Sequence, residues 1–106
     1  MANGRLGIAD LSANTNTTVY TVPAANFAVI TLSMCNRSAT QRSIRVAVAG
    51  ADTPTSGEYI EYDTSLVRHC TLERTGIVVS AGQKIVVHAN SVDVSAVVYG
   101  LETATA

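Results

Sequence analysis

Apolar and polar residues alternate along much of this chain with a period of two, the spacing of side chains on one face of a β-strand. The clearest run covers residues 27–35 and contains no charged residue, glycine or proline. One side of this run is apolar: Ala28, Ile30, Leu32 and Met34. The other side carries smaller and partly polar residues. The run predicts a central strand whose apolar side faces the core.

Shorter runs with a β pattern lie at nearly regular spacing on both sides of this strand. They cover residues 17–22, 44–48, 58–63, 70–75, 76–79, 83–88 and 92–99. No segment shows the 3.6-residue period of an amphipathic helix. A length of 106 residues is typical of one domain. We therefore predict that residues 1–106 form a single-domain, all-β fold, an antiparallel β-sandwich that is jelly-roll-like.

Two connections predict which strands are neighbours. Residues 44–48 follow residues 27–35 after about six polar residues, a spacing that favours an antiparallel pair. Residues 76–79 and 83–88 flank a three-residue loop that ends in Gly82, which can adopt a positive φ. This second pattern predicts a β-hairpin.

Two further segments are predicted to lie at the periphery of the fold. Residues 1–12 contain two glycines that weaken a strand pattern, so we expect an extended N-terminal arm or an edge strand. Residues 58–63 read as a short edge strand with acidic side chains facing water. Strict alternation in this strand places Tyr59 and Tyr62 on opposite faces.

The low content of charge changes the picture of the surface. Charged residues make up 14% of the chain, against about 25% in typical soluble domains, and the net charge is −1. This composition favours a subunit whose outside is covered by neighbours; a monomer covered by Ser, Thr and Asn is the alternative. The few basic residues are scattered, which argues against a nucleic-acid partner.

No apolar segment approaches the roughly 20 residues needed to cross a bilayer, so we expect no membrane partner. The N-terminus lacks the apolar core of a secretion signal, which predicts that the protein stays in the cytoplasm where it is made. Two cysteines are too few for a disulfide framework. Cys35 is expected to be a small buried residue. Cys70 lies in a more polar stretch and is a candidate for an intersubunit disulfide, although cytosolic thiols are normally reduced.

Candidate chemistry is sparse. His69 and His88 are the only histidines, and neither lies in a catalytic motif. His69 and Cys70 are adjacent, so in a strand they would point to opposite faces, which opposes a Cys–His pair. The acidic residues of 58–63 lack the spacing of a calcium loop. We therefore predict no catalytic residues, no metal site, no cofactor and no enzymatic activity.

Five blocks of the chain, taken together and in order, resemble a family of small virion proteins of tailed bacteriophages. They are residues 18–24, 35–40, 59–63, 72–82 and 97–102. The family includes decoration, collar and tail accessory proteins. The resemblance implies an antiparallel β-sandwich subunit of a phage particle and not an enzyme. Because members occupy different parts of virions, it leaves the position on the particle open.

Charge and resemblance together predict a non-enzymatic virion structural protein, assembled in the host cytoplasm. It would self-associate and pack on the capsid, neck, collar or tail surface, with copies of itself and other virion proteins as partners. The expected contacts lie in the N-terminal segment, the turn at residues 36–41 and the loop at residues 49–57. The contact residues are Arg5, Leu6, Ile8, Asn36, Arg37, Thr53, Pro54, Tyr59 and Tyr62. The alternative is an adhesin that binds host glycans through tyrosines and polar loop residues.

Overall fold

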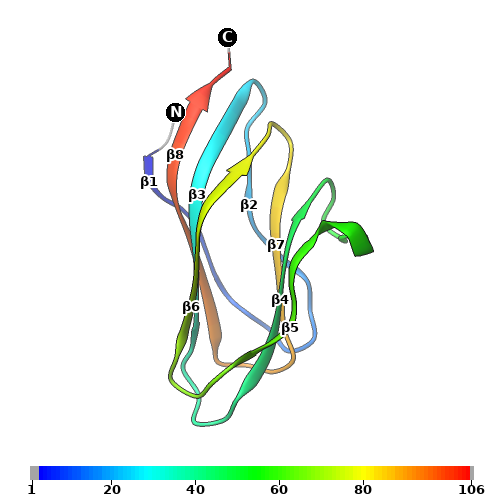
Figure 1. Cartoon of the computed structure of the whole chain (residues 1–106), viewed down its shortest axis with the longest axis vertical. Coiled ribbons are helices and arrows are strands. Elements are labelled where there is room, and N and C mark those ends of the chain that lie inside the picture. Colours follow the sequence, from blue (N-terminus) through cyan, green and yellow to red (C-terminus); the bar gives the residue numbers. More distant parts are fainter. Residues whose placement is uncertain (1–2, 106) are drawn as a thin grey trace.

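Eight strands and one short 3-10 helix make up the computed structural model, which describes residues 3–105 (Figure 1). The strands are β1 (Asn3–Asp10), β2 (Thr17–Thr21), β3 (Asn26–Asn36), β4 (Arg42–Ala49), β5 (Tyr59–Leu66), β6 (Thr71–Val79), β7 (Lys84–Ala89) and β8 (Val94–Ala104). The helix, η1 (Ser56–Glu58), precedes β5. A first sheet has the order β1-β8-β3-β6, and a second has the order β2-β7-β4-β5. The predicted all-β sandwich is confirmed.

The strand pairing is nested, and every pair is antiparallel. β1 pairs with β8, β2 with β7, β3 with β6 and β4 with β5. Two further pairs, β3 with β8 and β4 with β7, complete the sheets. A long hairpin folded over itself in this way is a jelly roll, as its sequence pattern predicts.

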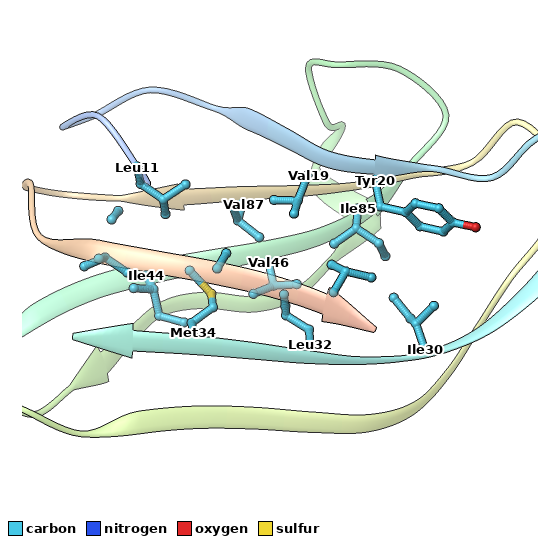
Figure 2. Close-up of a cluster of buried hydrophobic side chains, with 14 of the residues drawn as sticks. Leu11, Val19, Tyr20, Ile30, Leu32, Met34, Ile44, Val46, Ile85 and Val87 are labelled. Atoms are coloured by element: carbon cyan, nitrogen blue, oxygen red, sulfur yellow. The ribbon is translucent and has the colours of Figure 1, made fainter. Parts of the chain in front are cut away.

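The core lies between the two sheets and is built by the period-two pattern. The apolar side of β3 supplies Ala28, Ile30, Leu32 and Met34, each at most 1% exposed. Facing side chains from the second sheet include Ile44, Val46, Ile85 and Val87 (Figure 2). Burying each larger aliphatic side chain contributes about 1.5–3 kcal/mol relative to leaving it exposed. The inward face predicted for residues 27–35 is therefore confirmed.

Both predicted strand neighbourhoods are wrong. β3 and β4 lie in different sheets, and so do β6 and β7. Each connection crosses from one sheet to the other instead of returning beside the strand it leaves (Figure 1). The turn before β7 is tight, with Gln83 N donating to Ser80 O at 3.0 Å and Gly82 at φ +80°. A tight turn with a positive-φ glycine thus serves an arch between sheets as well as a hairpin.

The N-terminal segment belongs to the sandwich from residue 3 onward. β1 is an edge strand that pairs with β8 from Asn3 opposite Leu101 to Asp10 opposite Ser95. The next residue, Leu11, is only 3% exposed and lies in the core. Of the predicted arm, residues 1 and 2 lie outside the described part of the chain. The rest is an edge strand and the start of a turn, and not a free arm.

The last strand is longer than expected and carries a buried acid. β8 runs to Ala104, beyond the β pattern predicted at residues 92–99. Glu102 is 8% exposed and accepts a hydrogen bond from the hydroxyl of Tyr20, which belongs to the other sheet. Burial raises the pKa of Tyr20, and the hydrogen bond to Glu102 and its charge raise it further. The pair ties the two sheets together with the phenol protonated.

We expect Tyr20→Phe to change how stability depends on pH. A raised folded-state pKa stabilises the fold below the pKa of an unfolded tyrosine, about 10, and this contribution is lost as pH rises above it. The unfolding free energy of the wild type should therefore fall more steeply between about pH 10 and 11 than that of Tyr20→Phe, by up to about 1.4 kcal/mol per pH unit. Urea unfolding at several pH values measures this. Parallel pH profiles would contradict the assignment.

Candidate functional site

The predicted contact residues fall in three separate regions of the fold. Arg5, Leu6 and Ile8 belong to β1 in the first sheet. Asn36 and Arg37 lie where β3 ends. Thr53, Pro54, Tyr59 and Tyr62 lie in and just after the loop between β4 and β5, at the second sheet. The structure therefore brings together only the third group as one candidate site.

Three members of that group form a pocket with Ser56 at the edge of the second sheet. Pro54, Ser56, Tyr59 and Tyr62 line a cavity of about 550 Å³ that is open to solvent. The two tyrosine rings meet edge to face, with centroids 5.0 Å apart and an interplanar angle of 84°. Such a pair is a favourable aromatic geometry. We call these four residues the tyrosine pocket.

The prediction that Tyr59 and Tyr62 lie on opposite faces is wrong, because β5 is bulged. The register of β5 against β4 shifts between Ile44 and Val46 and again between Val46 and Ala47. Asp63 also has a positive φ of 51°. An extra residue at a bulge rotates the following side chains to the other face. The shift between Val46 and Ala47 falls between Glu61 and Tyr59, and this one inserted residue sets Tyr59 on the same side as Tyr62.

A polar network supports the pocket from β4 and β7. The guanidinium of Arg45 stacks over Tyr62 at 4.2 Å from the ring centroid, and its Nε donates to Asp63 Oδ1 at 2.7 Å. This hydrogen bond holds the pKa of Asp63 below its usual value. His88 lies opposite Arg45 in the register. Burial lowers the pKa of His88, and the charge of Arg45 lowers it further. At neutral pH the network therefore contains one ion pair and a neutral imidazole.

The loop above the pocket is held in place by its own acidic residues. Glu58 accepts hydrogen bonds from the backbone N–H groups of Thr55 at 2.8 Å and Gly50 at 3.0 Å. These bonds lower the pKa of Glu58. Asp52 accepts from the Thr18 hydroxyl at 2.6 Å. Thr53 is exposed between these anchors. The loop is thus a fixed wall of the site.

A second candidate surface was missed by sequence reasoning: the outer face of the first sheet. Eight large hydrophobic side chains are exposed among the described residues, and five of them lie on this face. They are Ile8, Val29, Val78, Tyr99 and Leu101, between 37% and 64% exposed. The register aligns Val78, Val29 and Leu101 in one row across three strands. Exposed apolar groups gathered on one face mark an interaction surface more often than scattered ones do.

The side chain of Asn36 has no exposed surface to offer a partner. It is 0% exposed, and its Nδ2 donates to the carbonyl oxygens of Thr40 at 2.9 Å and Leu66 at 3.0 Å. Its Oδ1 accepts from the backbone N–H of Ser38 at 2.9 Å. An asparagine side chain often hydrogen-bonds the backbone two residues further along in a turn. This tendency is the sequence signal that predicts a structural role for Asn36. Arg37 is exposed and ion-paired with Asp10.

The remaining chemistry-bearing residues do not form a site. Cys70 is exposed and Cys35, predicted to be buried, is half-buried; both are free thiols. Residues 3–105 contain no group of three or more His, Cys, Asp or Glu side chains that could hold a metal ion. None of the described elements is a helix with the length and hydrophobicity to span a membrane.

No family model, curated protein or solved structure matches this chain. The resemblance to phage virion proteins therefore stays a prediction. The tyrosine pocket and the outer face of the first sheet are the two features of the structure that bear on function.

Proposed function

We propose that this protein is a non-enzymatic structural subunit of a tailed-bacteriophage particle. It self-associates and packs on the capsid, neck, collar or tail surface. The observation that carries the proposal is the apolar outer face of the first sheet, with Val29, Leu101 and Val78 in one row. A chain with 14% charged residues has little charge with which to cover such a face in solution.

The presence of many copies on one particle explains how a weak contact between two subunits can be enough for stable attachment. Burial of apolar surface contributes about 25 cal/mol per Å², of which only the surplus over the cost of association appears as affinity. On a symmetric particle each copy contacts several neighbours at high effective concentration, so weak single contacts add up to stable attachment. The jelly-roll order is also common among viral capsid domains, which is an argument from fold alone.

The proposal predicts that Leu101→Asp weakens self-association at least about tenfold, because a carboxylate would be buried in an apolar contact. The fold should remain, because Leu101 is 57% exposed. Sedimentation velocity measures association, and circular dichroism measures folding. Val92→Asp is the matched control, since Val92 is 50% exposed but precedes β8 and lies off this face. Mass spectrometry of purified particles tests the location; a chain missing from them overturns the proposal.

The tyrosine pocket favours a second function, binding of host-surface glycans. A sugar ring has apolar C–H faces that stack on aromatic rings and hydroxyl groups that hydrogen-bond at its edge. Tyr62 is 58% exposed, and the charged groups of Arg45 and Asp63 lie beside it. The pocket thus offers both kinds of contact in one place.

For this second function, we expect wild-type protein to bind members of a glycan array and Tyr62→Ala to lose at least about tenfold in affinity, since the exposed ring would be the main apolar contact. Tyr99→Ala is the matched control, because Tyr99 is also a partly exposed tyrosine but lies on the first sheet. An array without signal for the wild type, or equal loss in both variants, would remove the glycan function.

A further inference from the structure

The outer face of the first sheet is complementary to itself in size. Its two central strands are β3 and β8. Smaller side chains on β3 stand opposite larger ones on β8 in three successive pairs: Val29 with Leu101, Thr31 with Tyr99 and Ser33 with Val97. If a second copy were placed with its β8 over this β3, each larger side chain would meet a smaller one. A twofold axis that runs along the strands, between β3 and β8, produces this placement.

The charges on the face select the same axis. Arg5 on β1 stands beside Tyr99, and Glu73 on β6 stands beside Ser33. A twofold axis along the strands puts β6 of one copy over β1 of the other. Glu73 and Arg5 of the two copies are then offset by one step of two residues, about 6.6 Å along the strand, which their side chains can span. Asp10 lies one such step away on the other side, but its charge is already paired with Arg37 of its own chain. A twofold axis across the strands would instead bring Glu73 of one copy near Glu73 of the other, and Arg5 near Arg5. Like charges facing each other oppose that arrangement.

The size of the face fits a second copy. Four strands about 4.8 Å apart and about eight residues of about 3.3 Å each give an outline of roughly 19 by 26 Å, or roughly 500 Å². Side-chain relief raises the accessible area toward the roughly 800 Å² per partner of a standard interface. Two sheets that pack face to face keep their strands within about 30° of each other, as a twofold axis along the strands requires.

We infer that the outer face of the first sheet pairs with the same face of a second copy, across a twofold axis parallel to the strands. The dimer contains two equivalent ion pairs, Arg5 of each copy with Glu73 of the other. This inference rests on the proposed self-association and adds its surface, its symmetry and its charge pairing.

A charge exchange tests the symmetry directly. In a dimer of Arg5→Glu, each of the two ion pairs is replaced by two facing carboxylates. In a dimer of Glu73→Arg, each is replaced by two facing guanidinium groups. We expect each variant alone to dimerise at least about tenfold more weakly than the wild type. An equimolar mixture should recover dimers, all of them mixed, because both ion pairs are restored in the mixed dimer. Native mass spectrometry distinguishes the mixed dimer from the two homodimers by mass.

Two controls separate the ion pair from other effects. Tyr99→Phe isolates the hydrogen bond from Tyr99 to Glu73, 3.0 Å within one chain, which Glu73→Arg also removes. Arg68→Glu makes the same charge change in the turn before β6, away from the face. Neither control should weaken the dimer by the amount that Arg5→Glu does.

The outcomes distinguish this inference from the proposed function. If the mixture stays as weak as the single variants, or if the single variants dimerise like the wild type, the twofold pairing is overturned. The proposed function then still depends on whether purified particles contain the chain. If mixed dimers form and particles lack the chain, the inference stands and the virion role is overturned.

Discussion

Replacing Gly100 with alanine is expected to destabilise the fold by about 3 kcal/mol or more. Gly100 lies in β8, paired with Ile30 of β3. A Cβ at this position would lie 2.1 Å from the carbonyl oxygen of Val29 and 2.9 Å from the Cα of Ile30. Its φ of +152° is also a conformation that side chains disfavour. Because the clash is with backbone, only separation of two central strands can relieve it.

Urea unfolding at fixed protein concentration measures this change, since association would shift the midpoint. Gly57→Ala is the matched control. A Cβ at Gly57 meets nothing within 4 Å, and its φ is not positive. The control should unfold at the wild-type midpoint. An unchanged midpoint for Gly100→Ala would show that β3 and β8 are not packed as described.

Asn36→Ala is expected to cost about 2–4 kcal/mol of unfolding free energy, although the side chain is polar and lies next to a turn. The carboxamide satisfies the carbonyl oxygens of Thr40 and Leu66 and the N–H of Ser38 where water has no access to it. Alanine removes all of these partners together. Leaving a buried polar group unsatisfied costs about 1–3 kcal/mol, and the exposed turn residues recover part of this from water.

Arg37→Ala is the comparison for this variant. Arg37 is exposed, and a surface ion pair such as the one with Asp10 contributes little to stability. Thermal unfolding should therefore separate the two neighbours clearly. If Asn36→Ala kept full stability and lost only self-association, Asn36 would return to the set of contact residues.

The inward face of the central strand β3 could be predicted from the sequence, and the partners of the strands could not. The alternation in residues 27–35 depends only on which side of β3 meets the core. The residues predicted to be buried in this strand are therefore the ones that the structure buries. The same alternation arises whether the chain next enters the same sheet or the opposite one. A turn such as that before Gln83 also fits either path, which is why both predicted neighbour pairs are wrong.

The candidate sites show a similar division. Tyr59, Tyr62 and Pro54 were predicted as contact residues from their type and position, and the structure places them around one pocket. Their shared position depends on a bulge that strict alternation cannot represent. The apolar row across β6, β3 and β8 joins residues far apart in the chain. Val29 and Leu101 therefore become neighbours only once the register of β3 with β8 is known.

The nested pairing of strands has a consequence for synthesis of the protein. Of the eight strands described, the first to be synthesised, β1, pairs with the eighth, β8, and β2 pairs with the seventh, β7. The first sheet cannot close until β8 has been synthesised, and the second cannot close until β7 has, whereas the β4–β5 hairpin can form earlier. Such distant pairing makes folding slow and leaves unfinished strand edges open to aggregation. A nascent chain of this protein must therefore remain partly unfolded until β8 is free to pair with β1 and β3.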